Sequence, residues 1–288
     1  MKVAIVSGKG GTGKSSITAA LVVQSTSVVA VDCDVDASNL PILFSHEVEQ
    51  TESFVSGRTL TIDVSLCMLC GACEQHCSFG ALHKMNKQMI VNNVLCEGCG
   101  LCEYLCPNDA ITLSDEANSR IYKSYFNHGT LIYGHLFPGD DNSGKMIARL
   151  RALADEEMKQ KQIQLQILDG PPGIGCPVIS TIIGMDKLII VTEPTQSGLS
   201  DLKRMYQTAI SFCRDISVII NKCDINQMEN KALRHFCECV RLPILAEIPF
   251  DKQVVEAQVY NETIMTYAPA SACAIELQKV NKQLIKKN

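Results

Sequence analysis

Gly8-Lys9-Gly10-Gly11-Thr12-Gly13-Lys14-Ser15 is the stretch of sequence that decides the fold. It matches GxxxxGK[ST] at every fixed position, and it lies between an apolar run at residues 3–7 and a segment with a helical pattern at residues 15–24. We therefore predict a buried strand, a glycine-rich loop and a helix in that order. In this context the motif predicts a phosphate-binding loop, or P-loop. The alternative is a flexible glycine-rich turn, but such a turn requires neither the lysine nor the hydroxyl residue.

The residue types of this loop predict how a nucleotide is held. Glycines let backbone N–H groups approach phosphate oxygens, and the N-terminus of the following helix adds positive potential. Lys14 is expected to reach the β- and γ-phosphates, and the Ser15 hydroxyl to ligate Mg²⁺. The predicted contacts in this segment are Gly8, Lys9, Gly10, Gly11, Thr12, Gly13, Lys14, Ser15 and Ser16.

The rest of the chain predicts an α/β fold with one insertion. Apolar runs at residues 28–31, 163–168, 187–192 and 216–220 alternate with helical patterns, which favours a doubly wound, mostly parallel sheet. Residues 120–126 and 130–136 are further candidate strands of this sheet. Residues 59–113 differ in composition and contain a repeat. We predict a nucleotide-binding domain in two parts, 1–58 and 114–288, around a small inserted α+β domain at 59–113.

Composition excludes several classes of protein. The chain has 288 residues and a formal net charge of −5, which gives no electrostatic footprint for nucleic acid. The apolar run at the N-terminus is too short for a signal peptide, and no apolar stretch approaches the roughly 18 residues of a membrane span. We therefore expect a cytoplasmic protein. In that compartment, clusters among its 15 cysteines indicate metal sites rather than disulfides.

Eight cysteines form two matching runs with the spacing CxxCxxCxxxC. The first run is Cys67, Cys70, Cys73 and Cys77, and the second is Cys96, Cys99, Cys102 and Cys106. This spacing is typical of bacterial ferredoxins with two 4Fe-4S clusters, in which the fourth cysteine of each run ligates the other cluster. Zinc also binds four thiolates, but zinc ribbons use pairs of CxxC rather than two such quartets. One departure from the ferredoxin pattern is Ser78, where proline is usual.

The position of Lys9 in the loop resembles that of a lysine in one superfamily of P-loop proteins. A lysine near the start of the loop is typical of the deviant P-loop in the superfamily that contains MinD, ParA, Mrp and the nitrogenase iron protein, and the whole chain resembles the members that carry an inserted ferredoxin domain. The resemblance implies a dimer in which Lys9 reaches the nucleotide of the partner. It implies a homodimer or a heterodimer with a paralogous ATPase.

Two aspartate-containing segments resemble the switch regions of that superfamily. In Asp32-Cys33-Asp34-Val35-Asp36, Asp34 is our choice for positioning the hydrolytic water, so Lys9, Lys14 and Asp34 are the predicted catalytic residues. Asp32 and Asp36 are weaker candidates, because such acids often cap a loop or helix. Asp169, in Asp169-Gly-Pro-Pro-Gly173, is expected to hold Mg²⁺ through water.

The identity of the base has two interpretations. Asn221-Lys222-Cys223-Asp224 matches the NKxD pattern by which GTPases recognise guanine. Relatives that resemble this chain use ATP, with an asparagine at this place and a loop such as Ile248-Pro249-Phe250-Asp251 beside the adenine. We favour ATP, with Asn221, Lys222, Pro249 and Phe250 at the nucleotide and ADP as the product.

Other features bear on possible partners. Ile275, Leu277, Val280 and Leu284 share a helical face, with Lys279, Lys282, Lys286 and Lys287 around it. Such a helix either packs on its own domain, which we favour, or contacts a membrane as in MinD. Most other cysteines are expected to be buried apolar residues. Cys176 follows Asp169 at the spacing of a cluster ligand in the nitrogenase iron protein, and we expect a reactive or partner-facing thiol there.

The leading hypothesis is ATP-gated electron transfer to a redox protein or a cofactor-assembly protein. An iron–sulfur cluster carrier like the Mrp group is an alternative, although the CPxC pair typical of that group is absent. A MinD-like ATPase for spatial positioning is a second alternative.

Overall fold

The computed structural model describes residues 1–137 and 142–285, and the chain forms two compact units. The first unit contains Met1–Glu52, Ile121–His135 and Ser143–Asn288. The second contains Ser53–Arg120 and Leu136–Asn142. Each unit is described by itself.

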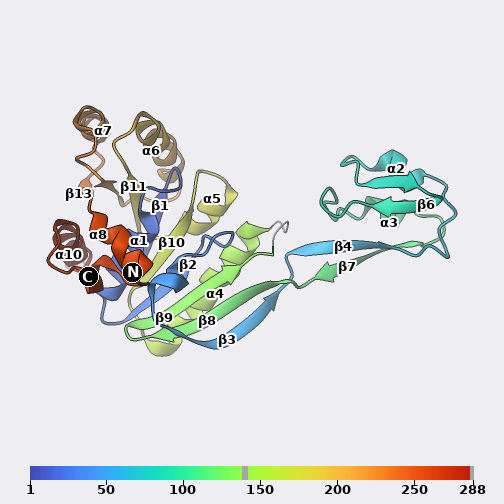
Figure 1. The fold of residues 1–288 in the computed structure, drawn as a ribbon, viewed down its shortest axis with the longest axis horizontal. Coiled ribbons are helices and arrows are strands. Elements are labelled where there is room, and N and C mark those ends of the chain that lie inside the picture. Colours follow the sequence, from blue (N-terminus) through green and yellow to red (C-terminus); the bar gives the residue numbers. More distant parts are fainter. Residues whose placement is uncertain (138–141, 286–288) are drawn as a thin grey trace. The chain divides into compact units, whose positions relative to one another are not determined.

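The first unit is built on a nine-stranded sheet (Figure 1). Its order is β13-β12-β11-β1-β10-β2-β9-β8-β3, and the pairs from β13 through to β9 are parallel. The central strands are buried along nearly their whole length, as expected for a sheet covered on both faces. The strands are β1 (Lys2–Ser7), β2 (Val28–Asp32), β3 (Glu47–Phe54), β8 (Ser119–Phe126), β9 (Gly129–His135), β10 (Gln166–Pro172), β11 (Lys187–Thr192), β12 (Ile216–Asn221) and β13 (Ile244–Ile248).

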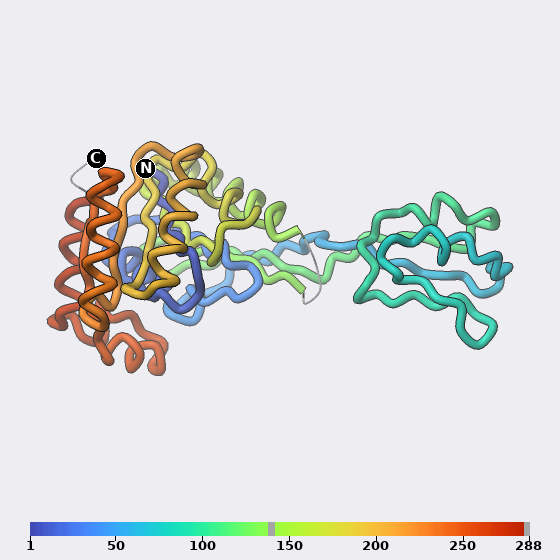
Figure 2. The backbone as a smooth tube through the Cα atoms, turned by 90° about the horizontal axis from the view of Figure 1, so that it is seen from above, coloured from blue at the N-terminus to red at the C-terminus, as the bar shows by residue number. Residues whose placement is uncertain are grey.

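Helices pack against this sheet in groups. α1 and α10 contact each other, and Figure 2 shows the red α10 in the same part of the unit as the blue N-terminal segment. α4 and α5 also contact each other, and α4 packs on β2 and β9. The helices are α1 (Lys14–Val23), η1 (Leu40–Leu43, a 3₁₀ helix), α4 (Ser143–Lys161), α5 (Cys176–Ile182), α6 (Gln196–Ala209), α7 (Gln227–Cys239), α8 (Lys252–Val259), α9 (Ile264–Tyr267) and α10 (Ala272–Ile285).

The predicted parallel sheet is confirmed, with one shift of a strand boundary. β8 and β9 lie in the main sheet, as proposed for residues 120–126 and 130–136. The strand predicted at residues 163–168 instead begins at Gln166 and continues past Asp169 to Pro172. Gln162 has a left-handed backbone, and the Ile163 amide donates to the Met158 carbonyl, so Ile163 completes the end of α4.

The C-terminal helix packs on its own unit, as we favoured. Leu277, Val280 and Leu284 are buried, and α10 contacts α1 and β13. Ile275, which was expected on the same buried face, is 43% exposed. Lys286 and Lys287 lie outside the described residues.

The second unit contains two small antiparallel sheets and two short helices. β4 (Gly57–Ile62) pairs with β7 (Ile111–Glu116), and β5 (Leu82–Met85) pairs with β6 (Gln88–Val91). The helices are α2 (Ala72–His76) and α3 (Leu101–Leu105). Each helix follows a glycine with a φ of 82°, so the two cysteine runs have the same local backbone. Leu60, Cys73, Leu82, Met89 and Ile111 form the core.

Candidate functional site

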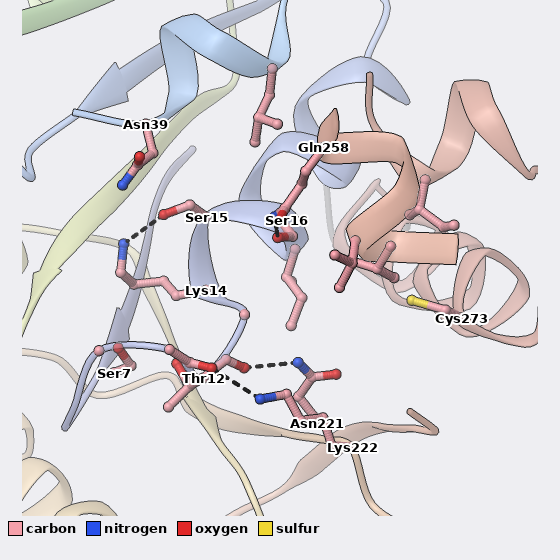
Figure 3. A pocket seen from close by; sticks show the side chains of 18 of the residues that line it. Ser7, Thr12, Lys14, Ser15, Ser16, Asn39, Asn221, Lys222, Gln258 and Cys273 are labelled. Carbon is pink, nitrogen blue, oxygen red and sulfur yellow. Dashed lines mark hydrogen bonds between the residues drawn. The ribbon is translucent and has the colours of Figure 1, made fainter. Parts of the chain in front are cut away.

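The predicted nucleotide segment forms one wall of a pocket of about 670 Å³ in the first unit (Figure 3). Residues 10–16 of the P-loop and α1 line it, together with Asp34 and Asn39 after β2. Asn221, Lys222, Pro249 and Phe250 line the pocket from the β12 and β13 side. Gly8, Lys9 and Asp169 are not among the lining residues. The structure thus brings together most of the predicted contacts, contributed by four separate segments.

Lys14 and Asp169 form a buried ion pair beside this pocket. The Lys14 ammonium lies 2.8 Å from Asp169 Oδ1, and the Thr18 hydroxyl donates to the same oxygen at 2.8 Å. Burial opposes the charge of Lys14, but the Asp169 carboxylate, helped by the charges of Asp32 and Asp34, outweighs this effect, and the pKa of Lys14 is raised. Asp169 Oδ2 is buried and has no hydrogen-bond partner within the described part of the chain. Such an orphaned carboxylate oxygen suits a magnesium-bound water.

Asp32 organises the loop that carries Asp34. Its carboxylate accepts hydrogen bonds from the backbone amides of Asp34, Asn39 and Leu40, and from the Ser38 hydroxyl at 2.7 Å. Burial raises its pKa to about 7, and the Asp169 charge adds to that effect. Asp32 therefore caps the loop, which was the alternative to a catalytic role for this residue.

Asp34 lies in the pocket wall and is only half-buried. Burial raises its pKa, while the nearby Lys14 charge partly opposes the rise. Asp36 is exposed and does not line the pocket. Of Asp32, Asp34 and Asp36, only Asp34 is thus in the wall of the pocket.

Glu193 is a charged residue that the sequence reasoning missed. It follows β11, is 9% exposed, and binds Lys9 at 2.7 Å through one carboxylate oxygen and Lys222 at 2.9 Å through the other. Burial alone would raise its pKa, but hydrogen bonds from the two lysines lower it. Its signal in the sequence was an acidic residue directly after an apolar run, the same signal that identified Asp169. In this chain Lys9 is held within its own subunit.

The cysteines of the second unit line two small cavities. One is lined by Cys67, Cys70, Cys73 and Cys106. The other is lined by Cys77, Cys96, Cys99 and Cys102, with Cys73 at its edge. Backbone amides donate to the two fourth thiols in equivalent positions: Ala81 to Cys77 at 3.4 Å and Ala110 to Cys106 at 3.2 Å. The fourth cysteine of each run therefore faces the cavity of the other run.

These thiols are not gathered around a single point. Among the residues that the structure describes, no group of three or more His, Cys, Asp or Glu side chains is arranged to hold one metal ion. Each thiolate of a 4Fe-4S cluster binds a different iron, so its four ligands surround the cluster rather than converge on one ion.

The other cysteines only partly follow their predicted burial. Cys33, Cys213, Cys237 and Cys273 are buried, whereas Cys223 is half-buried. Cys239 is exposed near the end of α7, within 3.6 Å of His235, so the expectation of burial is wrong for this residue. Cys176 is exposed at the start of α5.

A family model supplies the decisive comparison. Residues 3–264 match the CobQ/CobB/MinD/ParA nucleotide binding domain. The chain belongs to this family. An uncharacterized protein of Methanocaldococcus jannaschii, MJ0578, is 35% identical over 257 residues, which cover 88% of this chain and 86% of that protein.

Solved structures show the same fold as this member of the CobQ/CobB/MinD/ParA family. The cell division ATPase MinD of Pyrococcus furiosus has a TM-score of 0.60 at 18% identity, covering 100% of this chain and 99% of that one. The septum site-determining protein MinD of Pyrococcus horikoshii, complexed with Mg-ADP, has a TM-score of 0.58 at 18% identity, covering 99% and 96%. None of the described helices is long and apolar enough to cross a membrane.

Proposed function

We propose that this chain is an ATP-hydrolysing protein whose inserted unit holds two 4Fe-4S clusters, and that its nucleotide state gates electron transfer to a redox or cofactor-assembly protein. The observation that carries the redox part is the division of the eight cysteines between two cavities, each containing the fourth cysteine of the other run. Family membership and the P-loop pocket support the nucleotide part.

The hydrolytic residues have separate tasks. Backbone amides of residues 8–16 and the Lys14 ammonium hold the phosphates, while Ser15 and the free oxygen of Asp169 hold Mg²⁺. Asp34 orients the attacking water towards the γ-phosphate, and Lys14 stabilises the charge that develops there. Lys9 adds positive charge to the nucleotide of a partner ATPase in a homodimer or heterodimer. To do so it must leave Glu193, which binds it here.

The cysteine runs would hold the clusters in a crossed arrangement, in which the fourth cysteine of each run ligates the cluster of the other run. Cys67, Cys70, Cys73 and Cys106 form one ligand set, and Cys96, Cys99, Cys102 and Cys77 form the other. When bound, each cluster supplies one-electron transfer. The amides of Ala81 and Ala110 stabilise the negative charge on the two crossing thiolates. We propose residues 59–113 as the ferredoxin domain, with the ATPase domain at 1–58 and 114–288; the compact second unit that contains it is wider, at Ser53–Arg120 and Leu136–Asn142.

Cluster content gives the first test. Protein purified without oxygen is expected to contain about eight iron and about eight sulfide per chain, because each cysteine quartet binds one four-iron cluster. Iron by chelation assay and acid-labile sulfide should agree with the visible absorption of the sample. About four iron, or zinc in proportion to the chain, would contradict the two-cluster proposal.

A MinD-like positioning ATPase is the second candidate, and the comparisons favour it over the redox reading, because the matched solved structures quoted above are MinD proteins. Ile275 also remains exposed on α10. Co-sedimentation with anionic liposomes that depends on ATP would support this candidate. The redox proposal predicts no such dependence.

A further inference from the structure

The last residue of β12 and the first residue after it are attached to the P-loop through their side chains. Asn221 Nδ2 donates to the Thr12 carbonyl at 2.8 Å, and Lys222 Nζ donates to the Gly11 carbonyl at 3.0 Å (Figure 3). A Cβ on Gly13 would collide with the Asn221 amide, so the glycine permits this close approach. The first two residues of the NKxD match therefore support the loop that holds phosphate.

The aspartate of the match, Asp224, faces a different segment. Asp224 Oδ1 accepts a hydrogen bond from the Phe250 amide at 2.7 Å, and the adjacent Cys223 amide donates to the Ile248 carbonyl at 2.9 Å. Pro249 and Phe250 line the nucleotide pocket, but Asp224 does not. A carboxylate that reads guanine must offer both oxygens to the N1–H and N2–H donors of the base. Here Oδ1 accepts from the loop, and although the carboxylate has further lone pairs, it does not line the pocket.

The loop beyond Phe250 is connected to the other side of the pocket. Asp251 caps the start of α8 by accepting from the Gln253 amide at 2.9 Å. From the same helix, Gln258 Nε2 donates to the Ser16 hydroxyl at 2.7 Å, and Figure 3 shows these two side chains facing each other. Fixing the loop at Phe250 thus fixes the beginning of a helix that reaches the P-loop helix.

We propose that Asp224 is a positioning residue that holds the Pro249–Phe250 loop against the base and thereby favours adenine over guanine. Adenine presents an unprotonated N1 acceptor where guanine presents a donor. Diverting the Asp224 carboxylate to the Phe250 amide removes from the pocket an acceptor that would repel adenine and attract guanine. This inference rests on the nucleotide binding of the proposed function.

Two substitutions distinguish positioning from base reading. Asp224→Asn keeps an oxygen that accepts from Phe250, so its affinity for ATP should stay within about twofold of the unsubstituted chain. Asp224→Ala loses that oxygen and should bind ATP about 3- to 10-fold more weakly, the usual worth of one hydrogen bond. Neither variant should gain affinity for xanthosine triphosphate. Calorimetric titration of the full chain with ATP, GTP and xanthosine triphosphate measures the affinity for each nucleotide. Glu238→Ala, which removes an exposed acid on α7, controls for the loss of a negative charge.

The opposite pattern would overturn the inference. If Asp224 reads guanine, Asp224→Asn should lose GTP and gain xanthosine triphosphate, because an amide complements the extra oxygen of xanthine. Unchanged ATP affinity in Asp224→Ala would also refute the positioning role. A chain that binds neither ATP nor GTP would instead refute the proposed nucleotide function, so the two failures are distinguishable.

Discussion

Asp34→Ala is expected to bind ATP and yet lose turnover by about 100-fold or more, whereas Lys14→Ala should lose nucleotide binding altogether. Asp34 lines the pocket without belonging to the phosphate-binding loop, so its removal takes away water positioning and leaves the phosphate contacts. Lys14, by contrast, is proposed to contact the phosphates directly. Calorimetric binding and phosphate release, measured on the same samples, separate the two effects.

Matched controls make this contrast interpretable. Asp36→Ala removes an exposed acid two residues away and should hydrolyse ATP normally. Lys14→Ala also leaves the buried Asp169 carboxylate without its ion-pair partner, so we expect it to lower the melting temperature. Its binding is therefore measured well below its unfolding transition. Normal hydrolysis by Asp34→Ala would move the catalytic assignment to another residue.

Crossed ligation predicts which cysteine variants should resemble each other. Cys77→Ser should damage the same cluster as Cys99→Ser, although Cys77 belongs to the first run, because both thiols line one cavity. Cys106→Ser should likewise match Cys70→Ser. Each variant is expected to keep about half of the iron. Electron paramagnetic resonance of the reduced proteins identifies the cluster that remains.

The control for these variants is Cys239→Ser, an exposed cysteine of α7, which should keep all of its iron. If Cys77→Ser instead resembled Cys70→Ser, each run would bind its own cluster and the crossed arrangement would be wrong. Equal loss of both clusters in every variant would mean that the unit folds only when both are bound.

The sequence predicted the parts of the fold in which apolar residues are consecutive. β1, β2, β11 and β12 are buried on both faces, so each appears as an uninterrupted run. β3 was missed because its sequence, EVEQTESF, is largely exposed and shows no such run. The start of β10 was misplaced because Ile163, which was counted with the strand, follows the left-handed Gln162 and bonds back to α4.

The positions of site residues were predictable where a sequence motif determines the backbone conformation. They were less predictable where a charged side chain has several possible partners. Of the predicted contacts at residues 8–16, residues 10–16 line one pocket, whereas Gly8 and Lys9 do not. The sequence cannot tell whether Asp224 faces a base or the Phe250 amide, because that depends on contacts 26 residues apart. The same holds for Glu193, whose pairing with Lys9 and Lys222 joins three separate loops.

The central claim is that nucleotide state controls the clusters, and their reduction potentials test it most directly. If ATP changes a potential, reduction must change ATP affinity by the same free energy, typically about 1 to 3 kcal/mol. For a one-electron couple, a tenfold change in affinity corresponds to about 59 mV. Anaerobic titrations with ADP and with a non-hydrolysable ATP analogue should therefore give potentials that differ by tens of millivolts for at least one cluster. Identical potentials in the two states, with identical rates of electron donation from the reduced clusters to an oxidised protein acceptor, would contradict the claim.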